Sequence, residues 1–154
     1  MIETPHLVVT EPQHYAFLHL VVPTSEAKNA MGPAIEEVMA AVAQQGAKLA
    51  GTWFMHYLIR PVLHFDVKVC VPVAKPIRPL GRVETGFWPA TKAAQTIYHG
   101  NYSGLPAAWD KLEAWVKTQP GRPGTEFWER YLVGPDLNPH PADWRTELDW
   151  PMTD

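Results

Sequence analysis

The sequence has a single cysteine, Cys70, among its 154 residues. No internal disulfide can therefore form, and the paired-cysteine spacings of zinc sites are excluded. Long apolar runs are also missing, so no stretch has the length needed to span a bilayer, and the N-terminus lacks the basic start and apolar core of a signal peptide. These absences favour a soluble protein of a reducing compartment, and we expect a cytoplasmic location.

Charge of one sign is not concentrated anywhere along the chain. The 13 basic and 16 acidic residues give a formal net charge of -3, and no run of like charge occurs. Proteins that bind a phosphate backbone need a basic patch or stripe. We therefore expect no direct binding to nucleic acid.

The motifs of several enzyme classes are absent as well. The sequence contains no GxSxG, no P-loop and no GxGxxG after a strand, which argues against serine-hydrolase, nucleoside-triphosphate and dinucleotide chemistry. Its seven histidines are scattered, with no HExxH and no pair at one-turn helical spacing. We predict neither a metal site nor a cofactor.

What the sequence does contain is an internal repeat. A shift of 73 residues without a gap superimposes Gly51-Thr52 on Gly124-Thr125 and Phe54 on Phe127. The two copies cover residues of about 7–74 and 82–152. A repeat of this length suggests two modules that face each other, and a seam between such halves is a natural place for a pocket.

Both copies show the same predicted order of a strand, a helix and two strands. In the first copy we predict a strand over 15–22, a helix from near Met31 to Gly46, and strands over 51–59 and 64–73. In the second copy we predict a strand over 91–98, a helix that begins near Leu105, and strands over 127–133 and 144–150. A proline-rich connector, residues 72–81, marks the module boundary.

Hydrophobic periodicity assigns a buried stripe to each helix. The stripes are Met31, Ile35, Val38, Met39 and Val42 in the first, and Leu105, Trp109, Leu112 and Val116 in the second. With 46% hydrophobic residues the chain can bury one sizeable core. We therefore predict a single domain, residues 1–154, of the α+β class, with both helices packed on an antiparallel sheet.

Glu129 is the strongest candidate for a ligand contact. Period-two alternation places it on one strand face with Phe127 and Tyr131, and the repeat aligns it with His56. The alternative is an ordinary strand glutamate that points to solvent. If Glu129 is buried, its charged form needs a cation or hydrogen-bond donors, and a lipophilic cation would supply both charge and stacking.

Glu147 is the second candidate, with Thr146 and Leu148 on the opposite face of its strand. The alternative is a half-exposed strand with a weak surface pair between Arg145 and Glu147. If Glu147 instead lies beside Glu129, two carboxylates could divide acid and base roles.

Three segments, in order, resemble the motifs of one known family. Residues 98–105, YHGNYSGL, resemble an H-x-G-x-Y-x-x-L turn; residues 128–131, WERY, resemble W-E-x-Y; residues 145–148, RTEL, resemble R-T-E-[IL]. The chain thus resembles the GyrI-like small-molecule-binding domain, the effector module of AraC-type and MerR-type regulators, which also occurs in stand-alone form. The resemblance implies duplicated modules with pseudo-twofold symmetry and a ligand groove between the halves.

The resemblance also implies site residues. It makes Glu129 the pocket glutamate and Glu147 the second acidic position, whereas Lys68 stands where an acid is common in the first half. The full set of predicted ligand-binding residues is Trp53, His56, Tyr98, Tyr102, Trp128, Glu129, Tyr131 and Glu147.

We expect a stand-alone protein, monomer or homodimer, that binds a hydrophobic small molecule, cationic or heteroaromatic, with Glu129 as polar anchor. Two alternatives follow from the resemblance. One is a hydrolase of cyclopropane-bearing genotoxic compounds that uses Glu129 and Glu147. The other is a gyrase-inhibitor-like protein, so that a protein partner would be a regulator or gyrase; no membrane partner is expected.

Overall fold

The computed structural model describes all residues from 1 to 154. They form two compact units, which we call the N-terminal unit, residues 11–90, and the C-terminal unit, residues 1–10 together with 91–154. Each unit contains one α-helix and a set of antiparallel strands. The predicted α+β class is confirmed, and so is the order of strand, helix, strand, strand within each unit.

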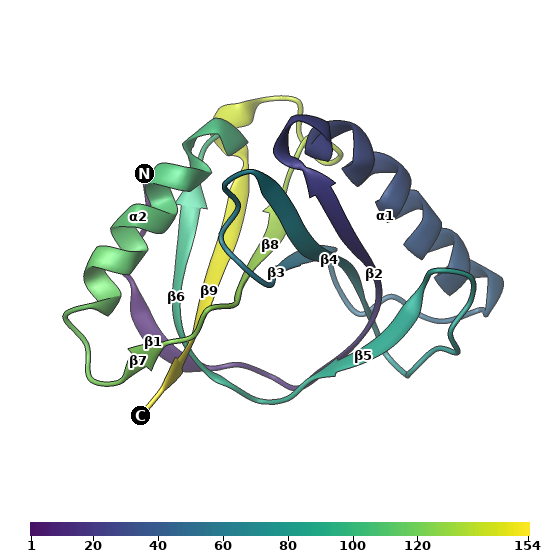
Figure 1. Cartoon of the computed structure of the whole chain (residues 1–154), viewed down its shortest axis with the longest axis horizontal. Helices are drawn as coiled ribbons and strands as arrows, with labels where there is room; N and C mark the ends of the chain where they lie inside the picture. Colours follow the sequence, from purple (N-terminus) through teal and green to yellow (C-terminus); the bar gives the residue numbers. More distant parts are fainter. The chain divides into compact units, whose positions relative to one another are not determined.

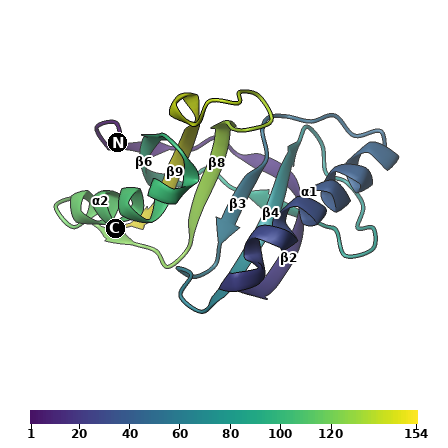
Figure 2. The ribbon, with the colours of Figure 1, turned by 90° about the horizontal axis from the view of Figure 1, so that it is seen from above.

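In the N-terminal unit, helix α1 packs against β2 and β4 (Figure 2). The hydrogen-bonded strand order is β3-β4-β2-β5. The elements are β2 (Gln13–Pro23), the 3-10 turn η1 (Thr24–Glu26), α1 (Ala27–Gln44), β3 (Phe54–Tyr57), β4 (His64–Val73) and β5 (Glu84–Trp88).

In the C-terminal unit, helix α2 runs alongside β6 (Figure 1). The strand order is β1-β6-β9-β8, and the short β7 pairs with the end of β9. The elements are β1 (His6–Val9), β6 (Lys92–His99), the 3-10 turn η2 (Tyr102–Gly104), α2 (Leu105–Val116), β7 (Arg122–Pro123), β8 (Phe127–Val133), the 3-10 turn η3 (Pro141–Asp143) and β9 (Arg145–Thr153).

Helix α1 buries only part of its predicted stripe, together with small side chains that were not predicted. Val38 and Val42 are buried as predicted, but Met39 is 39% exposed. Ala34 and Ala41 lie on the buried face instead. Alanine lets a helix axis approach the sheet closely, and this contact is invisible to a periodicity that weights residues by hydrophobicity alone. The prediction of a stripe through Met39 is therefore wrong.

Helix α1 begins earlier than predicted, at Ala27, and ends where the sequence indicates. Gly46 has a φ of 64°. Its amide donates to the carbonyl of Ala43, and the amide of Ala47 donates to the carbonyl of Val42. This pair of hydrogen bonds satisfies the last carbonyls of the helix and requires a left-handed residue, which explains the glycine.

Helix α2 agrees closely with its prediction. All four stripe residues, Leu105, Trp109, Leu112 and Val116, are buried. Pro106 occupies the first turn, where a missing N–H costs nothing because that group has no partner within the helix.

Three strands, β1, β5 and the two-residue β7, were not predicted. The sequence of β5, ETGFW, has no period-two alternation and follows the proline-rich connector. It forms because β2 offers a free edge, on which Tyr15 pairs with Gly86. The N-terminal unit therefore continues through the connector to Ala90. Strand β1 similarly pairs with the edge of β6. Its closest pair in sequence, Val9 with Lys92, is separated by 83 residues.

The predicted equivalence of His56 and Glu129 is wrong by one residue. His56 pairs with Lys68, whereas its neighbour Met55 lies on the face of fully buried valines beneath α1. Glu129 contacts α2. The residue of β3 that faces α1 as Glu129 faces α2 is therefore Met55. A slip of one residue in a strand moves each side chain to the opposite face, so an ungapped alignment cannot establish which face a side chain occupies.

Leu112 and Leu137 provide a matched test of the core in the C-terminal unit. Leu112 is fully buried and Leu137 is 66% exposed. We expect Leu112→Ala to lower the free energy of unfolding by about 2–5 kcal/mol, because it leaves a cavity. Leu137→Ala should change it by less than about 0.5 kcal/mol. Urea denaturation measures both, and equal effects would contradict this assignment of the core.

Candidate functional site

Two rows of side chains cross the C-terminal sheet on the face that α2 covers. Residues that pair directly across antiparallel strands share a face. The register therefore defines one row of Thr96, Leu148 and Glu129, and a second row of Tyr98, Thr146 and Tyr131. Five of the eight predicted ligand-binding residues lie on β8, β9 or β6, and three of them, Tyr98, Glu129 and Tyr131, belong to these rows.

Glu129 is buried, with 4% of its surface exposed. The indole Nε1 of Trp109 donates a hydrogen bond to Oε2 over 2.6 Å, and the hydroxyl of Tyr131 donates to Oε1 over 2.7 Å. These bonds join α2 to β8. Both donors are neutral, so they stabilise the carboxylate without cancelling its charge.

Aromatic rings surround this carboxylate. Tyr102 meets the edge of Tyr131 with ring centroids 5.5 Å apart, and it lies 5.0 Å from the ring of Trp144. Trp109 packs 4.4 Å from Phe127 on its other side. We call the five residues Tyr102, Trp109, Glu129, Tyr131 and Trp144 the Glu129 site.

The charge of Glu129 contributes to a raised pKa of Tyr102. Burial, followed by the negative charges of Asp136 and then Glu129, raises the pKa of Tyr102 to about 12. At neutral pH its hydroxyl is therefore protonated and can donate a hydrogen bond. Tyr102 is half-buried, so part of its side chain is accessible to solvent.

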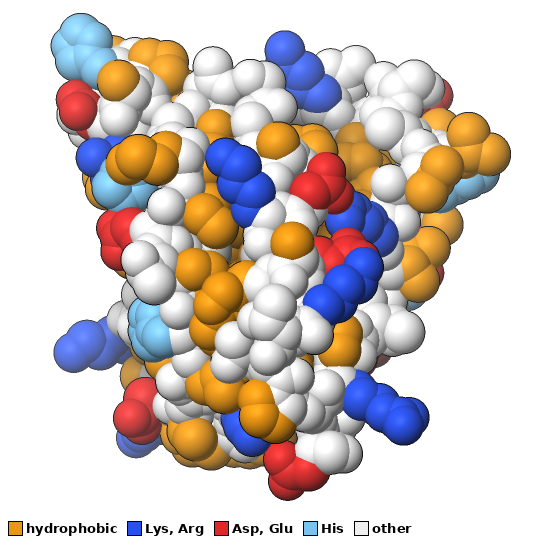
Figure 3. All heavy atoms as spheres, turned by 90° about the vertical axis from the view of Figure 1, so that its left-hand side faces the viewer, with side chains coloured by type: hydrophobic (Ala, Val, Ile, Leu, Met, Phe, Trp, Pro, Cys, Tyr) orange, Lys and Arg blue, Asp and Glu red, His pale blue; other side chains and the backbone are white.

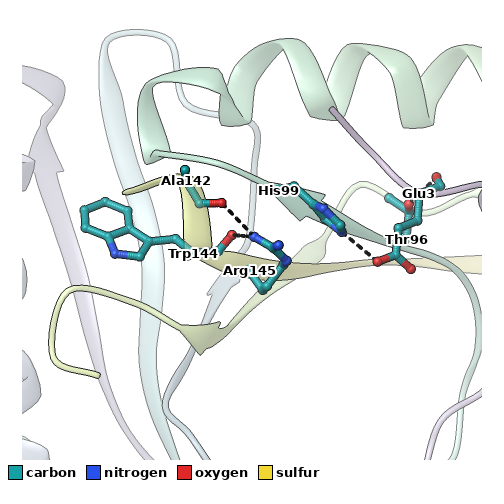
Figure 4. A network of polar contacts seen from close by, with 6 residues as sticks. All are labelled: Glu3, Thr96, His99, Ala142, Trp144 and Arg145. Carbon is teal, nitrogen blue, oxygen red and sulfur yellow. Dashed lines mark hydrogen bonds and ion pairs between the residues drawn. The ribbon is translucent and has the colours of Figure 1, made fainter. Parts of the chain in front are cut away.

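Trp144 is held in place by the loop that precedes β9 (Figure 4). Its indole Nε1 donates to the carbonyl of Asn138 over 2.8 Å. Arg145 Nη1 donates to the carbonyls of Ala142, at 3.0 Å, and Trp144, at 2.8 Å. The arginine of the R-T-E-L segment thus fixes the loop that carries an aromatic wall.

The turn between β6 and α2 is shaped around Tyr98. Its hydroxyl donates to the carbonyl of Asn101 over 2.7 Å. A side chain at Gly104 would collide with this hydroxyl, which explains the glycine. The N-terminal segment is bound to the same strand: Glu3 accepts hydrogen bonds from Thr96 Oγ1 at its carbonyl and from the ring of His99 at its carboxylate, each over 2.7 Å (Figure 4).

Glu147 lies on the opposite face of the sheet from Glu129. Its direct partner across the strands is Arg130, whose Nε lies 3.3 Å from Oε2. The expected surface pair with Arg145 is not the one that forms. Trp128, paired with Asp149, shares the face of Glu147. The two glutamates are therefore on neighbouring strands, but their side chains point to different faces.

Asp149, which the sequence analysis did not single out, is the most deeply buried carboxyl on that face, with 1% exposure. Gln95 Nε2 donates to its Oδ1 over 2.7 Å. Burial, and then a hydrogen bond and charge repulsion from Glu147, hold the pKa of Asp149 well above its ordinary value, although Gln95 and Arg130 act in the opposite direction. The protonated form of Asp149 is therefore favoured more than that of an exposed carboxyl group.

Two predicted residues, Trp53 and His56, belong to the N-terminal unit. His56 is 6% exposed on β3. Burial, and secondarily the charge of Lys68, lower the pKa of His56 to about 4. The ring is therefore neutral at pH 7. Lys68 itself lies 4.7 Å above the ring of Phe17, a cation–π contact on the same face.

Neither a metal cluster nor a membrane helix is found. No three His, Cys, Asp or Glu side chains gather as ligands for a metal ion. Neither α1 nor α2 combines the length and hydropathy that crossing a bilayer requires. On the face shown in Figure 3, basic and acidic side chains are interspersed with hydrophobic ones.

Two residues of the Glu129 site, Trp109 and Trp144, were not among the predicted ligand-binding residues. Trp109 was assigned to packing alone and Trp144 only to a strand end. The available signal was that a tryptophan on a buried helical stripe must find an acceptor for its N–H, and Glu129 is the buried acceptor of the facing strand.

A comparison with protein families tests the resemblance. The model of the GyrI-like small molecule binding domain matches residues 3–152. The chain belongs to this family. No curated protein matches the sequence.

Solved structures agree on the fold. The C-terminal domain of EcmrR is 22% identical, with a TM-score of 0.87 over 98% of both chains. EcmrR has also been solved with DNA, and this chain spans only 57% of the length of that EcmrR chain, at 24% identity. A hydrolase from Listeria innocua is 12% identical, with a TM-score of 0.69 over 97% of this chain and 91% of its own. SAV2435, solved bound to tetraphenylphosphonium, is 8% identical, with a TM-score of 0.66 over 98% of this chain and 94% of its own.

Asp149→Asn should stabilise the GyrI-like domain at high pH. Because the pKa of Asp149 is raised in the folded state, its contribution to stability is complete below the ordinary value of about 4 and is lost as pH rises through the raised value. Asparagine reproduces the protonated form, since it can accept from Gln95 and donate to Glu147.

We therefore expect Asp149→Asn to have a higher Tm than the wild type at pH 8 and a similar Tm near pH 4. Thermal unfolding across this range measures the difference. Asp154→Asn, at a 96% exposed side chain, is the matched control and should change neither value. A lower Tm for Asp149→Asn at pH 8 would contradict the raised pKa.

His56 should contribute to acid unfolding. Its folded pKa of about 4 lies below the unfolded value of 6.5, so stability is complete above pH 6.5 and is lost as pH falls toward 4. The shift corresponds to about 3 kcal/mol. We expect the free energy of unfolding of His56→Gln to fall less steeply than that of the wild type between pH 6.5 and 4. His140→Gln, at an exposed site, should follow the wild type.

Proposed function

We propose that this GyrI-like domain binds a hydrophobic, positively charged small molecule in the Glu129 site, with the carboxylate of Glu129 as its charge partner. The observation that carries the proposal is the burial of this carboxylate among aromatic rings with neutral hydrogen-bond donors. A buried carboxylate attracts a cation strongly, because low-dielectric surroundings screen the attraction less than water does.

The aromatic walls suit such a ligand. The rings of Tyr102, Tyr131 and Trp144 supply apolar area, and their faces attract cations. Tyr102 and Trp144 are half-buried and sit on a turn and a loop, so they form the side of the site that can open by loop movement. The fold is shared with SAV2435, a protein solved with the lipophilic cation tetraphenylphosphonium, which supports this ligand class.

The geometry favours a binding role over the two-carboxylate hydrolysis that the resemblance allowed. That mechanism requires Glu129 and Glu147 to act on one substrate, but the register points them to opposite faces of the sheet. The likeness to a Listeria innocua hydrolase extends to the fold, and no shared chemistry follows from it. We therefore keep Glu129 as a charge partner and assign no catalytic step to Glu147.

Binding of tetraphenylphosphonium and of tetraphenylborate, ions of the same shape and opposite charge, tests the proposal. Tryptophan fluorescence and calorimetry should show saturable binding of the cation and little binding of the anion. Glu129→Gln should weaken binding of the cation by about 10- to 100-fold, the usual cost of losing a buried charge partner.

Two control variants separate charge from structure. Tyr131→Phe removes one donor but keeps the carboxylate, so it should weaken binding of the cation less than Glu129→Gln does. Glu126→Gln, at an exposed position of the same unit, should bind like the wild type. If Glu129→Gln is folded by its thermal transition and binds the cation with unchanged affinity, the anchor role of Glu129 is disproved.

A further inference from the structure

Thr146 is a buried polar residue whose hydroxyl has no hydrogen-bond partner. Its exposure is 0%, and Oγ1 makes no hydrogen bond. A threonine hydroxyl can both donate and accept, and burial without a partner destabilises the folded protein. Valine would fill the same space without that penalty, so the hydroxyl calls for an explanation beyond packing.

The strand register places Thr146 in the Glu129 site. It pairs directly with Tyr131 on β8 and with Tyr98 on β6. Glu129 is its diagonal neighbour, because Glu129 pairs with Leu148, two residues further along β9. Direct pairs bring Cβ atoms to within about 5 Å and diagonal pairs to about 7 Å. The side chain therefore lies on the face of the sheet that carries the buried carboxylate.

The neighbouring polar groups already have partners within the protein. The hydroxyl of Tyr98 donates to Asn101, and the hydroxyl of Tyr131 donates to Glu129. Thr96, the other buried threonine of this face, donates to the carbonyl of Glu3. Thr146 is the exception among the buried hydroxyl groups of the two rows.

We propose that Thr146 Oγ1 is a second polar contact of the Glu129 site and hydrogen-bonds the ligand directly. This inference rests on the proposed function and narrows its ligand class. The preferred ligands are lipophilic cations that carry a neutral hydrogen-bonding group, a hydroxyl or a carbonyl, beside the charged centre. The carboxylate selects for charge, and the threonine selects among cations of equal charge and size.

Two matched phosphonium probes test this selection. One is triphenylphosphonium with a para-hydroxymethyl phenyl group, and the other carries a para-ethyl group of nearly the same shape. We expect Thr146→Val to weaken binding of the hydroxymethyl probe about tenfold relative to the ethyl probe, as loss of one hydrogen bond would. Thr146→Ser keeps the hydroxyl and should keep the wild-type ratio of affinities.

Thr96→Val is the matched control, because it makes the same substitution at an equally buried position of the same face. It removes a hydroxyl that has a partner, so its Tm should fall while the ratio of probe affinities stays at the wild-type value. Thr146→Val should not lower the Tm without ligand, because it removes a hydroxyl that has none.

Three results would overturn the inference. A lower Tm for ligand-free Thr146→Val would show that the hydroxyl is satisfied inside the folded protein, by a protein group or an internal water. An unchanged ratio of probe affinities in Thr146→Val, with binding still dependent on Glu129, would reject the threonine contact and leave the proposed function standing. Failure of the wild type to bind either probe or tetraphenylphosphonium would reject both.

Discussion

The buried carboxylate of Glu129 is the interaction on which the C-terminal unit is organised. It accepts hydrogen bonds from Trp109 on α2 and from Tyr131 on its own strand. A buried charge without donors would cost several kcal/mol, so α2 and β8 must keep these groups in register. The identities of Trp109 and Tyr131 follow from that requirement, because each combines a large apolar ring with a polar hydrogen-bond donor.

The two faces of the C-terminal sheet hold carboxyl groups in different environments. On the face of α2, Glu129 is surrounded by rings and neutral donors. On the other face, Asp149 and Glu147 hydrogen-bond to each other, and Arg130 and Gln95 offset their charge. Neighbouring carboxylates of opposite faces therefore cannot serve one reacting centre, although they stand on adjacent strands. This separation is the physical reason why membership of the GyrI-like family leads to a binding proposal here.

Much of the local structure could be predicted from the sequence. Strand β4 and strand β8 have the predicted bounds, the stripe of α2 is confirmed, and Gly46 ends α1 as expected. Each of these follows from interactions between residues close in sequence, namely alternation, helical periodicity and a left-handed glycine. The family motifs could also be recognised in the sequence, because the turn around Tyr98 and the loop fixed by Arg145 each need particular residue types at fixed spacing.

Tertiary structure decided the rest. Strands β1 and β5 form only because distant strands offer free edges, and packing of α1 on its sheet buries Ala34 and leaves Met39 exposed. The face occupied by Glu129 relative to His56 or Glu147 depends on strand register, which a one-residue shift reverses. The sequence thus identified Glu129 and its strand, whereas its partners Trp109 and Trp144, and the unpaired hydroxyl of Thr146, emerged only when packing brought separate elements together.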